Sequence, residues 1–377
     1  MMESKRLLYV VNDLKFFISH RLAIAKMAKD KGYEVHVAAM PNPAQAVLKE
    51  HGFIFYALPL NRSGRNPFLE LWCLISIWWL FWKVRPSIVH LVTIKPVLYG
   101  SIASRFSPVK GVVAAISGLG YVFLAKGYKA GLVRFLVSLL YKVALGRKRL
   151  IVIFQNESDR NVFFEKNIIN YKRTVLIKGS GVDLNVFSPK PEPKGEKTVV
   201  FAARLLKDKG VVEFFDAISI LESRSVKANY LIAGDIDPGN PTSLTKMELG
   251  RLCQGKPVSV IGYRSDMPEV FENCHLVVLP SYREGLPKVL AEAAASGRAV
   301  VTTDVPGCRD AIEPGISGLL VKVKDAQDLA NAIAKVITNE TLRVSMGHAG
   351  RRLAEQEFAI EKIVSQHLDV YEELAQS

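Results

Sequence analysis

The stretch EGLPKVLAE (residues 284–292) begins and ends with a glutamate, and a glycine and a proline follow the first one closely. The preceding run HLVVLPS (residues 275–281) is short and apolar, which predicts a buried strand. Pro287 suits the start of a helix, and the following LAEAAAS is rich in helix-forming residues. The sequence therefore predicts a strand, a tight loop that carries Glu284, and a helix that carries Glu292 in its second turn.

This arrangement of carboxylates suits a ligand that contains phosphate. Free amides at a helix start favour an anion, and ligands of parallel sheets lie beyond the carboxyl ends of the strands. A phosphate could rest on these amides while Glu284 and Glu292 bind hydroxyl groups on either side of it. From the spacing alone, an ordinary strand–helix unit with two solvated glutamates remains an alternative.

The same alternation of short apolar runs and helical patterns extends along the chain. Strands are predicted at RLLYVV, YEVHVAA, SIVHLVT and GVVAAIS in the first half, and at TVVFAAR, NYLIAGD, HLVVLP and AVVTTD in the second. Such alternation predicts an α/β fold of two Rossmann-like, doubly wound domains with parallel sheets. These domains are expected to face each other across a cleft that the strand ends line.

The segment FSPKPEPKGEK (residues 187–197) is rich in proline and charge and lacks periodicity, so it is the expected linker. The predicted domains are residues 1–187 and residues 188–360. A closing helix over 361–377 could cross back onto the first domain.

Composition excludes several other classes of protein. The chain has 377 residues, of which 49% are hydrophobic, enough for two packed cores. Its four cysteines form no CxxC pair, so neither a zinc site nor a disulfide framework is predicted, which suits a reducing cytoplasm. The N-terminal segment reads as a first strand and not as a signal peptide.

The net charge of +14 is unevenly distributed. Residues 1–190 hold 28 Lys and Arg against 10 Asp and Glu, whereas the other residues hold 22 against 26. Between Glu70 and Glu157 there are twelve Lys or Arg and no acidic residue. A solvated surface normally mixes both signs, so the first half is predicted to meet an anionic partner.

Two apolar, basic segments indicate that this partner is a membrane surface. All tryptophans fall within residues 71–85, and a stretch over 125–149 again mixes long apolar and basic side chains. The uninterrupted apolar run of twelve residues is too short to span a bilayer, but it suits a helix at the lipid headgroups. Alternatively, both helices cover a sheet with their apolar sides in the core. Nucleic acid is disfavoured because no recognition motif is present. The predicted membrane contacts are Trp72, Trp78, Trp79, Trp82, Lys126, Lys129 and Arg134.

Three further motifs follow predicted strands in the second half. FAARLLKDKG carries Arg204 and Lys209. The forked guanidinium of the arginine and the compact ammonium charge of the lysine together suit a diphosphate. IGYRSD offers Tyr263 and Arg264 as a rim for a flat base. AGDID carries two aspartates, which form either a loop beside a nucleotide or a site for a divalent cation.

Taken in order, these motifs resemble the retaining GT-B glycosyltransferases of family 4. The signature of that family is two glutamates separated by seven residues, preceded by an Arg…Lys pair. FQNESDR, SGVD, LPSYREGLPKVLAEA and TTDVPGC are similar to the subgroup of N-acetylgalactosaminyltransferases that extend undecaprenyl-diphosphate-linked sugars in bacteria. The resemblance covers nearly the whole chain.

This resemblance implies a role for each motif residue. Arg204 and Lys209 would hold the donor diphosphate together with the backbone around Gly285, Leu286 and Pro287. Glu284 would bind the donor sugar, Glu292 the ribose, and no metal or other cofactor would be needed.

The resemblance also implies that the first domain binds the acceptor. Residues expected near its strand ends are His20, Arg21, His90 and Lys95, together with Ser117 and Gly118. His90 is the candidate for a second catalytic residue beside Glu284, although a lone histidine is more often structural. If the acceptor attacks from the front face, so that the sugar keeps its anomeric configuration, the enzyme needs no nucleophile–base pair, which would explain why none is evident.

The expected function is therefore transfer of a sugar, such as N-acetylgalactosamine, from a UDP-sugar to a polyprenyl-diphosphate-linked acceptor. The enzyme would be cytoplasmic and peripheral on the inner face of the membrane. Two alternatives stay open at this point. One is a UDP-N-acetylglucosamine 2-epimerase with a similar fold, and the other is a non-enzymatic protein that binds membranes or polyanions.

Overall fold

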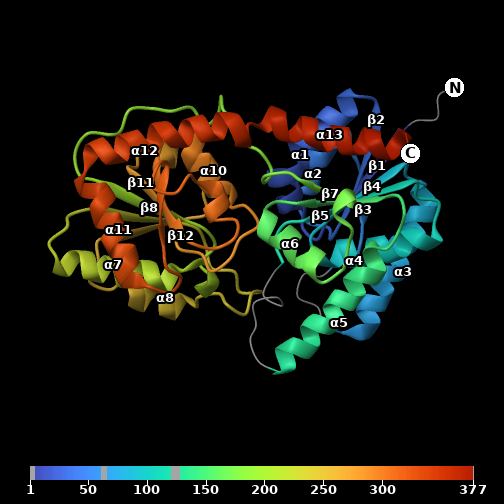
Figure 1. The fold of residues 1–377 in the computed structure, drawn as a ribbon, viewed down its shortest axis with the longest axis horizontal. Helices are drawn as coiled ribbons and strands as arrows, with labels where there is room; N and C mark the ends of the chain where they lie inside the picture. The colour runs from blue at the N-terminus through green and yellow to red at the C-terminus, as the bar shows by residue number, and fades with distance from the viewer. Residues whose placement is uncertain (1–4, 61–65, 120–127, 377) are drawn as a thin grey trace. The chain divides into compact units, whose positions relative to one another are not determined.

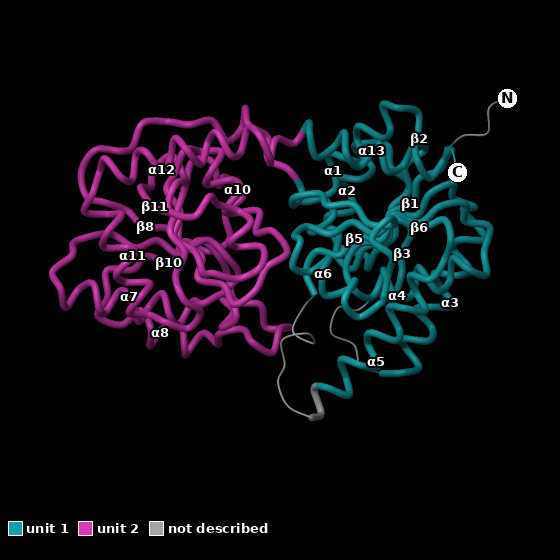
Figure 2. The backbone as a smooth tube through the Cα atoms, in the orientation of Figure 1, with its two compact units in different colours: residues 1–180, 361–377 teal, residues 181–360 magenta. Residues whose placement is uncertain are grey.

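A computed structural model describes residues 5–60, 66–119 and 128–376, with side chains from residue 131 onward in the third range (Figure 1). The chain divides into two compact units (Figure 2). Unit 1 comprises Met1–Ser180 and Glu361–Ser377, and unit 2 comprises Gly181–Ile360. Each unit is a parallel sheet with helices on both faces, as predicted for an α/β protein with two Rossmann-like domains.

The sheet of unit 1 has the strand order β3-β2-β1-β4-β5-β6-β7, with every neighbouring pair parallel. The order reverses between β1 and β4, which makes their carboxyl ends the expected place for a ligand. The strands are β1 (Lys5–Val10), β2 (Tyr33–Ala39), β3 (Ile54–Ala57), β4 (Ile88–Val92), β5 (Gly111–Ile116), β6 (Leu150–Phe154) and β7 (Thr174–Leu176).

Apolar side chains of the strands form a core on one face of this sheet, together with side chains of α3, α4, α5 and α6. On the other face, Tyr9 of β1 contacts Phe17 of α1 and Tyr371 of α13. The helices of unit 1 are α1 (Leu14–Asp30), α2 (Gln45–Glu50), α3 (Pro67–Val84), α4 (Ile94–Ala103), α5 (Tyr128–Leu145), α6 (Glu157–Glu165) and α13 (Ile360–Gln376).

Hydrogen bonds between buried side chains fasten the C-terminal helix α13 to unit 1. The Tyr371 hydroxyl lies 2.9 Å from the hydroxyl of Tyr9 and 2.6 Å from Nδ1 of His90. The His367 ring stacks on His90 with centroids 5.7 Å apart. Because a buried polar group is costly without its partner, this cluster fixes how α13 packs on the sheet.

Unit 2 repeats the same plan with the strand order β10-β9-β8-β11-β12-β13, again all parallel. Here the order reverses between β8 and β11. The strands are β8 (Thr198–Ala202), β9 (Asn229–Ala233), β10 (Val258–Gly262), β11 (Leu276–Leu279), β12 (Ala299–Thr303) and β13 (Gly318–Val321).

Two apolar clusters cover the two faces of this sheet. One includes side chains of α7 and α11, and the other side chains of α9 and α10. The helices of unit 2 are α7 (Val211–Ser223), α8 (Lys246–Cys253), α9 (Met267–Glu272), α10 (Lys288–Ala295), α11 (Ala326–Thr338) and α12 (Glu340–Leu353), which continues through a π-helical segment (Ala354–Phe358).

The segment predicted to be the linker, residues 187–197, belongs to unit 2 instead. Buried Arg298 donates 2.9 Å to the carbonyl of Lys190, and buried Arg343 pairs with Glu192 through two contacts of 2.8 Å. These side chains hold the proline-rich segment on unit 2. The chain therefore passes between the units at 180/181 and 360/361, and the first boundary lies seven residues before the predicted one.

Candidate active site

The candidate donor site lies at the carboxyl edge of the unit 2 sheet, where the strand order reverses. The loop after β8 forms a short 3₁₀ turn, η4 (Lys207–Lys209), and α7 begins directly after Gly210. The loop after β11 carries Glu284 and leads into α10. Since β8 and β11 are hydrogen-bonded neighbours, these two loops meet at one edge of the sheet.

Lys209 and Glu284, which are 75 positions apart in the sequence, form an ion pair across these loops. The Lys209 side chain is 20% exposed and that of Glu284 is 12% exposed, so the pair is largely withdrawn from water. An ammonium group has three N–H donors, and Glu284 occupies one of them. Lys209 can therefore orient Glu284 and still donate to a phosphate oxygen.

Backbone contacts fix the positions of both loops. The amide of Tyr282 donates to the carbonyl of Asp208 at 2.9 Å, and the amide of Glu284 donates to the carbonyl of Pro306 at 3.2 Å. A Cβ placed on Gly307 would lie 2.5 Å from the Glu284 carbonyl oxygen, so a glycine is required for this close approach. The Lys209–Glu284 pair therefore rests on a braced backbone.

Arg204, two residues beyond β8, pairs with Asp237 in the loop after β9 at 2.6 Å. The sequence identified both residues but not their contact. Among the described residues, no three His, Cys, Asp or Glu side chains come together as a group that could hold a metal ion. The observed partner of the Asp237 carboxylate is the Arg204 guanidinium.

Glu292 lies in the second turn of α10 and is 7% exposed. Burial raises the pKa of this carboxyl above its usual range, and the Lys288 ammonium at 3.0 Å partly opposes the shift. Sequence reasoning missed Lys288, although its spacing of four residues from Glu292 on one helix face was a usable signal.

Replacing Glu292 with glutamine is expected to stabilise unit 2 and, on the prediction that Glu292 binds a ribose, to weaken nucleotide binding. Because the folded-state pKa is raised, ionisation of Glu292 costs stability as pH rises from the usual glutamate pKa through the raised one. Glu292→Gln removes this loss, so its unfolding midpoint at pH 8 should exceed that of the wild type, while its affinity for UDP should fall.

Thermal unfolding at pH 4 and pH 8, with and without UDP, measures both effects. Glu222→Gln, an exposed change of the same kind on α7, is the control and should alter neither quantity. A destabilised Glu292→Gln that still binds UDP at full strength would contradict this reading.

The other predicted donor-site residues lie on the same sheet edge. Leu286 and Pro287 are buried just before α10, and Gly285 precedes them. Tyr263 is 77% exposed after β10, and Arg264 is held by Asp266, with Nε 2.7 Å from a carboxylate oxygen. Their predicted contacts with diphosphate and base stay predictions.

In unit 1, the carboxyl ends of β4 and β5 carry three of the predicted acceptor-side residues. Lys95 lies in the first turn of α4, where its ammonium pairs with Glu70 of α3 at 2.5 Å. Ser117 and Gly118 directly follow β5, and the Ser117 hydroxyl has no hydrogen-bond partner among the described residues.

Thr93, which the sequence analysis did not single out, lies between β4 and α4 with φ 75°. Its hydroxyl is enclosed and does not cap α4, and it too lacks a hydrogen-bond partner within the described ranges. The sequence contained a signal for this unpaired hydroxyl. A threonine that caps a helix commonly binds the backbone amide three residues later, and here that residue is Pro96, which has no N–H group.

The prediction that His90, His20 and Arg21 lie near strand ends was wrong. His90 is the third residue of β4 and is fully buried, and burial lowers the pKa of its imidazole well below the usual value. His20 and Arg21 lie in the interior of α1, and Arg21 is 2% exposed. His90 and Arg21 are therefore parts of the buried cluster beneath α13.

The predicted membrane helices α3 and α5 both expose large apolar side chains. Trp72, Trp79 and Trp82 are at least 45% exposed, and Trp78 is 38% exposed. The Trp78 and Trp82 indoles donate to the Phe106 carbonyl at 2.7 and 3.0 Å. α3 is long and apolar enough to cross a membrane by length and composition alone, but one side packs in the core through Ile77 and Phe81, among others.

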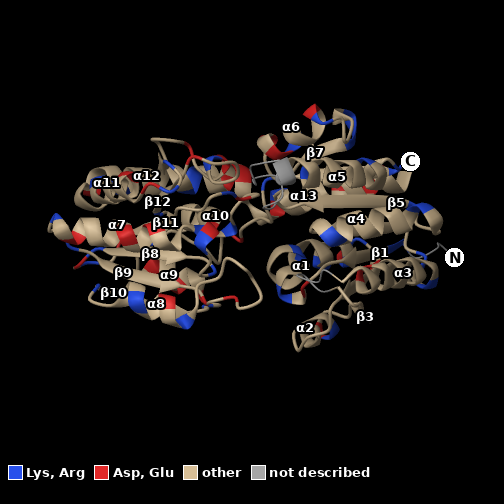
Figure 3. Cartoon of the chain, turned by 90° about the horizontal axis from the view of Figure 1, so that it is seen from below, with Lys and Arg blue, Asp and Glu red and all other residues tan. Residues whose placement is uncertain are grey.

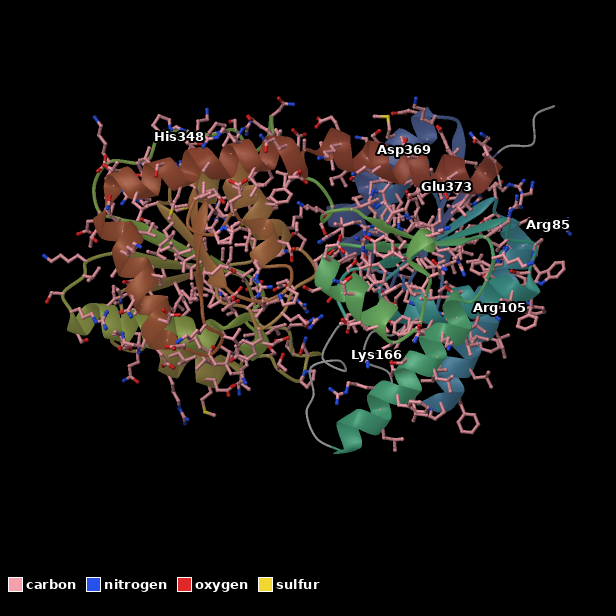
Figure 4. All side chains as sticks on the ribbon, in the orientation of Figure 1. Arg85, Arg105, Lys166, His348, Asp369 and Glu373 are labelled. Atoms are coloured by element: carbon pink, nitrogen blue, oxygen red, sulfur yellow. The ribbon has the colours of Figure 1, made fainter. Side chains whose placement is uncertain are left out.

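Basic residues accompany these helices. Arg85 follows the last residue of α3 and Arg105 lies beyond α4 (Figure 4), and Figure 3 marks the Lys and Arg positions along the chain in blue. Arg134 is half-buried on α5. Lys126 and the side chain of Lys129 lie outside the described residues.

Sequence profiles of two protein families match the chain. The family described as Glycosyl transferases group 1 matches residues 184–353, and the family described as Glycosyl transferase 4-like matches residues 6–156. Together they cover most of both units.

Individual proteins give the same result. The N,N'-diacetylbacillosaminyl-diphospho-undecaprenol alpha-1,3-N-acetylgalactosaminyltransferase of Campylobacter jejuni is 31% identical over 352 residues, which are 88% of this chain and 91% of that protein. The UDP-Gal:alpha-D-GlcNAc-diphosphoundecaprenol alpha-1,3-galactosyltransferase of Escherichia coli is 25% identical, covering 79% of this chain and 78% of its own.

Among solved structures, sucrose-phosphate synthase of Thermosynechococcus elongatus superposes with a TM-score of 0.81 over 99% of this chain and all of its own, at 18% identity. At that identity the likeness concerns the fold. The chain therefore belongs to the group 1 glycosyltransferases, with a glycosyltransferase 4-like first half and the GT-B fold of two Rossmann-like domains.

Proposed function

We propose that this glycosyltransferase moves an N-acetylhexosamine, such as N-acetylgalactosamine, from a UDP-sugar to a polyprenyl-diphosphate-linked sugar with retention and without a metal. The single observation that carries the proposal is the braced Lys209–Glu284 pair between β8 and β11. The two named relatives act, by their names, on sugars linked to undecaprenol through diphosphate, which supports this class of acceptor.

The donor diphosphate would lie against Lys209, Arg204 and the first amides of α10. As the bond to the sugar breaks, negative charge grows on the departing diphosphate. Fixed cations and helix amides stabilise that charge without having to reorganise. Glu284, held by Lys209, would accept hydrogen bonds from the donor sugar, and Glu292 would accept them from the ribose.

The acceptor would bind at the carboxyl ends of β1, β4 and β5 in unit 1. The enclosed hydroxyls of Thr93 and Ser117 lack partners within the described part of unit 1, and hydroxyl and acetamido groups of a sugar would satisfy them. The Lys95 ammonium adds a cation in the first turn of α4, which suits a diphosphate.

A peripheral position on an anionic membrane, on its cytoplasmic face, is the second part of the proposal. α3 and α5 expose long apolar side chains with basic residues beside them, and a lipid-linked acceptor has to be reached at the bilayer surface. The inward side of α3 packs in the core of unit 1, so this helix would lie on the surface with its outward side in the headgroups.

A glutamate at an exposed apolar position of α5 is expected to release the protein from vesicles. Phe135 is 65% exposed, and loss of its burial together with repulsion from anionic lipid should lower partitioning about 10- to 100-fold. Sedimentation with vesicles that contain anionic phospholipid measures this for Phe135→Glu.

Met247→Glu is the matched control, because Met247 is an apolar residue of unit 2 with 64% exposure. It should bind the vesicles like the wild type. Equal binding of the wild type and Phe135→Glu would argue against this surface.

The reaction itself is tested by UDP release from a panel of UDP-sugars, with and without a short polyprenyl-diphosphate-linked sugar, in EDTA. We expect release that requires the lipid-linked acceptor and persists in EDTA. Release without the acceptor would contradict the acceptor class, and loss of activity in EDTA would contradict metal independence. No turnover with any UDP-sugar would remove the substrate claim.

A further inference from the structure

Three of the described cation–carboxylate pairs at the carboxyl edge of the unit 2 sheet involve residues predicted to bind the donor's diphosphate, sugar or ribose, and one of these three is open to solvent. Glu284 pairs with Lys209, and Glu292 pairs with Lys288; the side chains of both glutamates are at most 12% exposed. In the third pair, the side chains of Arg204 and Asp237 are 43% and 28% exposed. An anion from solution can therefore approach the Arg204 guanidinium directly.

The loop that carries Asp237 is held against the Arg204 loop by the backbone. The Asp237 amide donates to the Ser243 hydroxyl at 2.8 Å, and the Leu244 amide donates to the Leu205 carbonyl at 2.9 Å. The Leu205 amide in turn donates to the Asp235 carbonyl at 2.9 Å. Backbone hydrogen bonds therefore hold the loop in a position from which the Asp237 carboxylate contacts Arg204.

From this geometry we infer that Asp237 competes with the donor's diphosphate for Arg204. The inference rests on the proposed function. In the empty site, the Asp237 carboxylate pairs with the Arg204 guanidinium. When a nucleoside diphosphate binds, its oxygens replace the carboxylate. When UDP leaves, the pair between Asp237 and Arg204 forms again. Asp237 is therefore a residue that weakens nucleotide binding and speeds release of the product.

Electrostatics supports this exchange. A guanidinium forms similar paired hydrogen bonds with carboxylate and with phosphate, so either anion can occupy it. The pairing is solvent-exposed and therefore weak enough to be displaced. A carboxylate that remains beside a bound diphosphate repels it, which lowers affinity mainly through faster dissociation.

The competing reading is that Asp235 and Asp237 hold a divalent cation that binds the diphosphate. The two readings predict effects of opposite sign. If Asp237 competes, its removal tightens nucleotide binding; if Asp237 carries a cation, its removal weakens binding, and EDTA weakens it in the wild type.

The test is calorimetric UDP affinity together with stopped-flow dissociation rates for the full-length wild type and Asp237→Asn, in EDTA. We expect UDP to bind about tenfold more tightly to the variant, equivalent to about 1.4 kcal/mol, mostly through slower dissociation. Asp216→Asn removes the same charge from an exposed site on α7 and should leave both quantities unchanged.

A double variant tests whether the effect passes through Arg204. In an Arg204→Ala background, Asp237→Asn should no longer tighten UDP binding. If the wild type binds UDP and Asp237→Asn binds it equally or more weakly, the inference is wrong while the proposed function stands. If the wild type binds no UDP at all, the proposed donor class fails, and the inference fails with it.

Discussion

Lys209→Met is expected to lower acceptor-dependent UDP release about 100- to 1000-fold and to lower stability, because the largely buried Glu284 loses its partner. Removal of one fixed donor from the place where charge develops typically costs a rate factor of this size. Lys209 is also the group that orients Glu284, so the variant loses a phosphate contact and frees a carboxylate beside the donor. Steady-state turnover and thermal unfolding of the same preparation measure the two quantities.

Lys207→Met is the matched control in the same turn. Its ammonium points to Glu248 at 2.9 Å, and its side chain is 52% exposed. The control should keep wild-type turnover within a factor of a few, because a surface ion pair contributes little. A Lys209→Met variant that turns over like Lys207→Met would exclude Lys209 from the reaction.

Gly210→Ala is expected to destabilise unit 2 by about 2–5 kcal/mol and to abolish most activity. A Cβ at this position would lie 2.1 Å from the Pro280 carbonyl oxygen, at the end of β11. The residue also has φ 74°, which costs a side chain about 1–2 kcal/mol, and forced overpacking adds about 1–3 kcal/mol. Relief of the clash would push η4 and Lys209 away from Glu284. Denaturant unfolding and UDP-release assays measure both losses.

Gly255→Ala separates backbone strain from the clash. Gly255 has φ 70°, close to that of Gly210, but no described atom lies within 4 Å of its added Cβ. It should show the smaller, conformational part of the destabilisation and retain activity. If both substitutions change stability and activity equally, the close approach of Gly210 to Pro280 does not position the site.

Local signals in the sequence were sufficient to predict the elements that frame the donor site. The apolar run over 275–281 contains β11 (Leu276–Leu279), and the alanine-rich segment after Pro287 forms α10 (Lys288–Ala295). Gly297, just past that helix, has φ 67°, the left-handed conformation in which glycine commonly ends helices. Hydrophobic periodicity and turn-forming residues depend only on residues that are close in the chain, so a single sequence is enough to detect them.

Contacts between distant residues could not be predicted in the same way. Arg204 meets Asp237 over 33 positions, and Lys209 meets Glu284 over 75. The proline-rich segment 187–197 resembled a linker because the buried arginines that hold it lie far along the chain: Arg298 is 108 positions from Lys190, and Arg343 is 151 positions from Glu192. His90 resembled a strand-end residue because the pattern IVHLV does not reveal that α13 covers it.

The central claim is that this chain adds an N-acetylhexosamine to a lipid-linked sugar. Mass spectrometry of a polyprenyl-diphosphate-linked sugar incubated with UDP-N-acetylgalactosamine and the protein in EDTA tests it most directly. We predict that the acceptor gains the mass of one N-acetylhexosamine with the wild type and not, on the same time scale, with Lys209→Met. An acceptor of unchanged mass, with UDP-sugar consumed or isomerised instead, would contradict the account.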